Sequence, residues 1–95
     1  MSSKRQSDPD KLLKKHEGLV HSTDMKVASH VQRQEGDWII NTIMIEGYDV
    51  PFRFKRKKAY RNVKGARVNI TYYPDRIAVA GFDMEIMNVV RIKIA

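Results

Sequence analysis

From residue 24 onward, apolar and polar residues alternate with a period of two, which is the spacing of side chains on one face of a β-strand. In the first run, residues 24–34, one parity is mostly apolar: Met25, Val27 and Val31. After a tight turn at residues 35–37, residues 38–45 carry β-branched side chains on both faces, as a central strand covered on two sides does. The pattern predicts a single β-domain over residues 24–95.

The middle of the chain predicts two further strands with a helical turn between them. Residues 50–56 alternate, with phenylalanine on one parity and cations on the other. Residues 57–64 place their apolar side chains at helical spacing and end at Gly65, which predicts one or two helical turns. Residues 67–73 alternate again, and we expect this strand to stop at a turn over residues 74–75.

The two ends of the chain differ in character. Residues 82–94 predict one long or bulged strand, or two strands, because Asn88 interrupts their shared apolar parity. We expect residues 1–6 to be a disordered tail and residues 7–23 to be an N-terminal helix with its connecting loop. The helix start is indicated by a serine cap followed by aspartate and proline in the first turn.

These elements predict a mainly β fold with small α content: a five- to six-stranded antiparallel curled sheet or small barrel behind a short N-terminal helix. Three meandering strands, a short helix and a final strand pair follow the order of elements in the oligonucleotide-binding (OB) barrel, which the predicted architecture resembles. An SH3-like barrel or a plain curled antiparallel sheet would give much the same pattern, so these topologies stay open.

Composition limits the chain to one small domain. It has 95 residues and no cysteine, which excludes disulfides and thiolate metal ligands. The first residues are polar and lack the apolar run of a secretory signal. The longest apolar stretch, residues 38–45, is far shorter than the roughly 20 residues that span a bilayer. We expect a cytoplasmic protein that does not contact a membrane.

The positive charge is concentrated in residues 50–74, which contain eight Lys or Arg and no acid. The rest of the chain has ten Lys or Arg against eleven Asp or Glu, so the net charge of +7 arises in this window. A surface built only for solubility intersperses both signs, and the segregation therefore favours a polyanionic partner. Outward lysines also protect edge strands, which is the alternative explanation.

Parity separates the aromatic residues of this window from its cations. Phe52, Phe54 and Tyr72 fall on the core parity, whereas alternate cations form an outward row spaced about 6.6 Å apart. Tyr73 points away from Tyr72, to the face where a ring is placed to stack on a base. This arrangement favours contacts to the phosphate backbone over base-specific recognition. The predicted nucleic-acid contacts are Arg53, Lys55, Lys57, Lys58, Arg61, Lys64, Arg67 and Tyr73.

Catalytic and metal-binding motifs are not found in the sequence. His16, His21 and His30 are spaced by five and nine residues, which matches neither a helical pair nor a zinc finger. The serines lie in no nucleophile motif, and the glycines form no phosphate-binding loop. We expect a non-enzyme without metal or cofactor.

Two functions follow from these observations. The first is a small basic module that binds nucleic acid, either RNA or single-stranded DNA, through a backbone-directed cationic patch. The alternative is an interaction module or accessory subunit without a nucleic-acid role, in which the same patch meets an acidic protein. In either case we expect a monomer or a weak homodimer.

Overall fold

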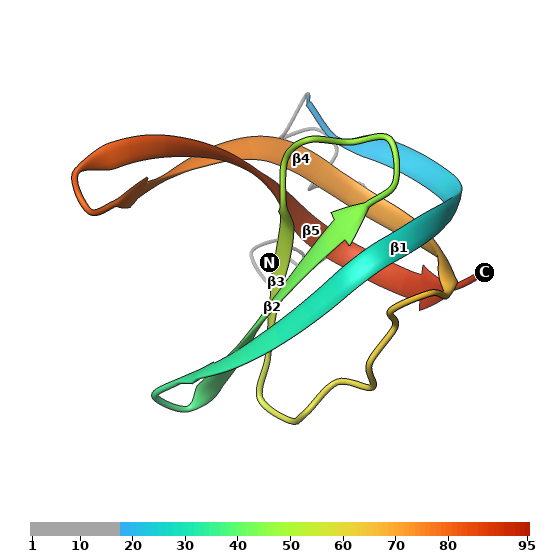
Figure 1. Ribbon diagram of the computed structural model, residues 1–95, viewed down its shortest axis with the longest axis horizontal. Coiled ribbons are helices and arrows are strands. Elements are labelled where there is room, and N and C mark those ends of the chain that lie inside the picture. The colour runs from blue at the N-terminus through green and yellow to red at the C-terminus, as the bar shows by residue number, and fades with distance from the viewer. Residues whose placement is uncertain (1–17) are drawn as a thin grey trace, which may run out of the picture.

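The computed structural model describes residues 18–95, which form an all-β, five-stranded mixed sheet (Figure 1). No helix occurs among the described residues. The predictions for the tail and the N-terminal helix fall on residues 1–17, outside this part. The strands are β1 Val20–Glu35, β2 Trp38–Ile45, β3 Phe52–Arg56, β4 Arg67–Val79 and β5 Phe82–Ile94.

The sheet closes on itself in the order β1-β2-β3-β5-β4, with β4 returning to β1, although the ring is not a regular barrel. Every neighbouring pair is antiparallel except β3 and β5, which are parallel. The expectation of a fully antiparallel sheet is therefore wrong. A closed ring with an odd number of strands cannot alternate direction all the way round, so one pair must be parallel.

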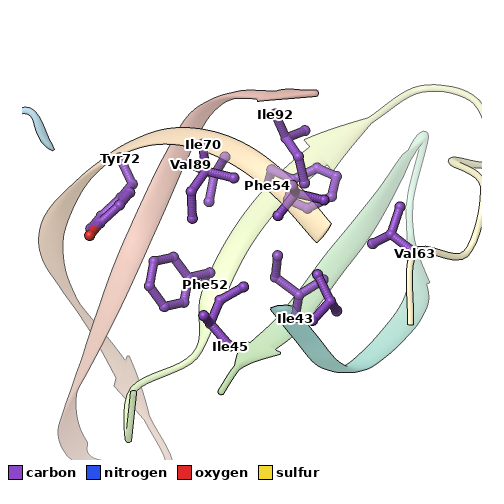
Figure 2. Packing of buried hydrophobic residues seen from close by; sticks show 11 residues of the cluster. Ile43, Ile45, Phe52, Phe54, Val63, Ile70, Tyr72, Val89 and Ile92 are labelled. Atoms are coloured by element: carbon purple, nitrogen blue, oxygen red, sulfur yellow. The ribbon is translucent and has the colours of Figure 1, made fainter. Parts of the chain in front are cut away.

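The interior of the ring holds the apolar core. Phe52, Ile43 and Val68 are fully buried, and the Phe52 ring meets the Tyr72 ring edge-on with centroids 4.9 Å apart. Figure 2 shows the side chains of Phe52, Ile43 and Tyr72 pointing into one interior with Val89 and Ile92 of β5. The core positions predicted for Phe52, Phe54 and Tyr72 are confirmed.

The helix expected over residues 57–64 is wrong, because this segment is an irregular connection that packs against β1. Two N–H groups at its end bond to β1, and a single turn follows, in which the N–H of Ala66 donates to the Val63 carbonyl over 2.9 Å. The N–H of Val63 donates to His30 Nδ1 over 3.0 Å, and the N–H of Gly65 donates to the Val27 carbonyl over 2.9 Å. Val63 is 1% exposed and joins the core, so burial of one side chain holds the segment in place.

Strand β4 continues through the turn expected at residues 74–75. Pairing of β4 with β1 ends at Tyr72, so Pro74 lies where β4 is an edge on its β1 side and tolerates proline. The strand ends at Val79 instead, and the turn is made by Ala80 and Gly81, both with positive φ. The β4–β5 hairpin therefore extends well beyond the ring, as does the β1–β2 hairpin (Figure 1).

Bulges change which residues face the core. A register shift between Val27 and Ser29 in β1 buries His30 and leaves Val31 61% exposed, so the alternation expected there is wrong after Val27. A second register shift lies in the β4–β5 pairing, between the pairs Thr71–Arg91 and Tyr72–Val89, and it turns Val89 inward. This confirms a single bulged strand for residues 82–94. Strand β1 also begins at Val20, inside the range expected for a connecting loop.

Candidate functional site

The outer face of β2 and β3 carries the first part of the cationic row. Lys55 pairs with Ile40 and Arg53 pairs with Thr42, which places these side chains on the face opposite the core. Lys55 is exposed and Arg53 is half-buried. Lys57 follows directly after the strand and is exposed. The outward row predicted for these three cations is therefore present.

An exposed indole lies among these cations. Trp38 starts β2, is 41% exposed and shares the outward parity of Ile40. The ammonium nitrogen of Lys57 lies 4.9 Å from the Trp38 ring centroid, and that of Lys55 lies 6.0 Å away. These are cation–π distances. The outer face thus combines one large aromatic surface with two flexible positive charges.

The sequence prediction missed Trp38 because its stretch was assigned to a covered central strand. A usable signal was present in the tight turn that precedes it. Gly36, with φ of 60°, takes the first position of a two-residue hairpin turn and fixes the pairing of Glu35 with Trp38. A residue at the end of a projecting hairpin has no strand beyond it to cover its outer side.

An open groove of about 520 Å³ runs beside this face, between β3 and the bases of the two projecting hairpins. One wall is formed by the end of the β1–β2 hairpin and by β3, and the other by β4 and β5. Its charged residues are Glu35, Arg53, Lys55, Arg56 and Asp75. The apolar lining is Ile40, Phe54, Ile77, Ile86 and Val89, with Asn88 between them.

The remaining predicted cations lie elsewhere. Lys58, Arg61 and Lys64 are exposed on the connection between β3 and β4, and none of them lines the groove. Arg67 lies where β4 pairs with β1, and its guanidinium is 3.5 Å from a carboxylate oxygen of Asp24. The structure therefore brings two predicted cations, Lys55 and Lys57, together at Trp38, places Arg53 farther along the same face, and pairs Arg67 with an acid on β1.

Tyr73 lies on the outer face of β4, opposite Tyr72 as predicted, but it is half-buried and does not line the groove. Burial raises the pKa of the Tyr73 hydroxyl, and the negative charge of Asp75 raises it further. Burial also raises the pKa of Tyr72, although its hydrogen bond to the Ser22 hydroxyl acts in the opposite direction. Trp38, not Tyr73, is the aromatic residue that the fold places beside the cations.

The cations of residues 53–64 have few internal partners. Within residues 18–95 only two ion pairs form, Arg33 with Glu35 and Arg67 with Asp24. The cations without an acid partner in this part of the chain are Arg53, Lys55, Arg56, Lys57, Lys58, Arg61 and Lys64. Arg56 packs its guanidinium over the Phe54 and Tyr60 rings, at 4.9 and 5.4 Å from the centroids. The others project toward solvent or into the groove.

A buried polar network fixes the connection that carries Lys58, Arg61 and Lys64. Since His30 Nδ1 accepts the Val63 N–H, its Nε2 donates to Asn41 Oδ1, 2.8 Å away. The Gln32 amide donates to the same Asn41 oxygen over 2.9 Å and to the Tyr60 carbonyl. Sequence alone gave His30 no role, because its burial depends on the bulge in β1.

Neither a cluster of metal ligands nor a membrane-spanning helix occurs among the described residues. Among residues 18–95 no three His, Cys, Asp or Glu side chains gather as metal ligands would, and His21 instead hydrogen-bonds the Thr71 hydroxyl over 2.8 Å. The described residues also contain no helix with the length and apolar character needed to cross a bilayer.

Comparison with known proteins identified no relative. Searches against protein-family models, curated proteins and solved structures each returned no match to this chain.

Proposed function

We propose that this protein is a non-enzymatic module that binds nucleic acid on the outer face of β2 and β3. The observation that carries the proposal is the exposed Trp38 indole with the Lys55 and Lys57 ammonium groups beside it. Arg53 on the same face borders the groove. The cations contact phosphates and the indole stacks on a base.

The energies expected from the phosphate and stacking contacts favour weak sequence selectivity. Three phosphate contacts, from Arg53, Lys55 and Lys57, give a slope of about −2 in log affinity against log salt for a single strand, at about 0.7 per contact. Stacking of one base on Trp38 contributes about 1–3 kcal/mol, and every base offers a π-face. Neither contact distinguishes one base from another.

The strand order supports an OB-like assignment over an SH3-like one. The neighbouring strands β4-β1-β2-β3 have the spatial order of a Greek key, in which the fourth strand returns beside the first. A five-stranded Greek-key barrel describes the OB fold, whose strands 2 and 3 form the oligonucleotide-binding face. The cation and tryptophan cluster lies on the corresponding strands.

Trp38 provides a direct test, because it is the only tryptophan in the chain. We expect a labelled single-stranded oligonucleotide to quench its fluorescence, with binding that weakens between about 50 and 200 mM salt. The double variant Lys55→Gln/Lys57→Gln should reduce the salt slope by about 1.4. The matched control is Arg91→Gln/Lys93→Gln, which removes the same charge from exposed β5 positions that do not line the groove.

Two results would contradict the proposal. Equal weakening by both double variants would mean that net charge alone drives binding. Equal binding of a polyanion without bases, such as heparin, with no change in Trp38 fluorescence would favour the alternative, an acidic protein partner for the same cations.

A further inference from the structure

The β4–β5 hairpin forms an arm that projects past the ring. We define the arm as residues 75–79 and 82–86, which pair with each other through to the turn. Pairing of β4 with β1 ends at Tyr72, and β5 meets β3 only through Met87 and Asn88. The arm is therefore a two-stranded ribbon, and both of its edges are open among the described residues.

One face of the arm is apolar except for Asp75 at its base, which pairs with Ile86. The cross-strand pairs Ile77 with Met84 and Val79 with Phe82 place these side chains on the same side, together with Ile86. Exposure rises outward along this face: Ile86 is 4% exposed, Met84 43%, Val79 44% and Phe82 73%. The opposite face is polar, with Arg76 paired to Glu85 and Ala78 to Asp83.

The apolar face of the arm continues one wall of the groove. Ile77 and Ile86 line the groove together with Ile40, and the facing wall carries Arg53 and Lys55. An occupant that matches both walls must present an anionic edge to β3 and a flat apolar surface to the arm. A strand of nucleic acid with unstacked bases has this chemistry.

The positions of the two acidic residues in the groove determine which wall the phosphates of the ligand contact. Glu35 is already paired with Arg33, 2.5 Å away. Asp75 belongs to the arm wall, where its carboxylate accepts the Arg76 N–H over 2.8 Å and the Asn88 amide over 3.3 Å. A phosphate is repelled from the Asp75 wall and attracted to the cationic wall of β3.

We propose that the groove takes a single, unpaired nucleic-acid strand, with its phosphates along β3 and its bases turned onto the apolar face of the arm. This inference rests on the proposed function and specifies its ligand. A duplex keeps the faces of its bases inside its own stack, so it satisfies the cations of β3 but leaves the apolar face of the arm uncovered.

The test compares three labelled ligands of equal length: a single-stranded DNA, its blunt duplex and an abasic phosphodiester strand. We expect the single strand to bind at least about fivefold more tightly than either of the others, as one lost base contact of 1–3 kcal/mol implies. The variant Phe82→Ala/Met84→Ala changes only exposed side chains of the arm. It should weaken single-strand binding about 5- to 100-fold and leave abasic-strand binding unchanged.

The control is Val20→Ala/Val90→Ala, which truncates two exposed apolar side chains that do not line the groove. If duplex and single strand bind equally and Phe82→Ala/Met84→Ala binds as the unmodified protein does, this inference is overturned while nucleic-acid binding stands. If no oligonucleotide binds and Trp38 fluorescence does not change, both proposals are overturned. Tighter binding of an acidic, aromatic peptide than of the single strand would also overturn the inference that the groove takes a nucleic-acid strand.

Discussion

Replacing His30 by alanine should destabilise the protein strongly, although no sequence motif marks this residue. His30 is 8% exposed and joins three segments: β1, which contains it, β2 through Asn41, and the β3–β4 connection through Val63. Alanine removes the acceptor of the buried Val63 N–H and one of the two donors to Asn41 Oδ1. The imidazole also packs near the rings of Phe54 and Tyr60.

The expected loss is about 2–4 kcal/mol. A buried N–H left without an acceptor costs about 1–3 kcal/mol, and the lost ring contacts contribute about 1 kcal/mol more. Asn41 Oδ1 still accepts a hydrogen bond from Gln32, so losing the bond from His30 adds little to this cost. A domain of this size has a total stability of roughly 5–10 kcal/mol, so the variant loses a large part of it. The melting temperature should fall by about 8–32 °C, at roughly 4–8 °C per kcal/mol.

Urea denaturation followed by far-ultraviolet circular dichroism gives the free energy of unfolding. The control is His21→Ala, because His21 is exposed and its bond to Thr71 lies at the surface, so its loss should stay below about 0.5 kcal/mol. His30→Asn retains a side-chain acceptor and should recover part of the loss. A decrease below about 1 kcal/mol for His30→Ala, equal to that of His21→Ala, would refute the role of this network.

Three further results are expected. Stability should decline as the pH rises above about 10, because unfolded tyrosines lose their protons there while Tyr72 and Tyr73, whose pKa values are raised, keep theirs in the folded protein. Titration of Tyr73→Phe should show a shallower decline, and an unchanged curve would contradict this. Ala80→Asn should raise the free energy of unfolding by about 0.5–1 kcal/mol, and the melting temperature with it. Ala80 has a φ of 51° in the hairpin turn, and asparagine adopts a positive φ more readily than alanine. Val63→Ala should lower the free energy of unfolding, measured by urea denaturation, by about 1–3 kcal/mol. The control is Ala59→Gly, at an exposed position in the same connection. An equal loss for both variants would show that Val63 does not hold the β3–β4 connection in place.

Local patterns identified the strands and much of the core because side-chain alternation is a property of the backbone itself. Phe52, Phe54 and Tyr72 were assigned to the interior from parity alone, and all three are buried. The same reasoning placed Arg53 and Lys55 on the outer face, where they lie. These assignments needed no knowledge of which strands are neighbours.

Patterns failed where a distant segment competes for the same backbone or side chain. Residues 57–64 have helical spacing, but the hydrogen bonds of Val63 and Gly65 go to β1, and burial of Val63 outweighs the local propensity. Likewise Pro74 predicted a turn, yet pairing with β5 carries β4 onward to Val79. The bulge that buries His30 also depends on a partner strand.

The sequence by itself determined that this is a small β-protein whose net positive charge arises in one segment, because strand periodicity and the charge of a segment are local quantities. Only the tertiary structure decided which of those charges act together. Closing the ring brings β3 beside β2 and parallel to β5, which sets Lys55 and Lys57 against Trp38 and opens the groove toward the arm. The same closure places Arg67 next to Asp24 on β1. Strand pairing joins residues far apart in the chain, so no local pattern contains this information.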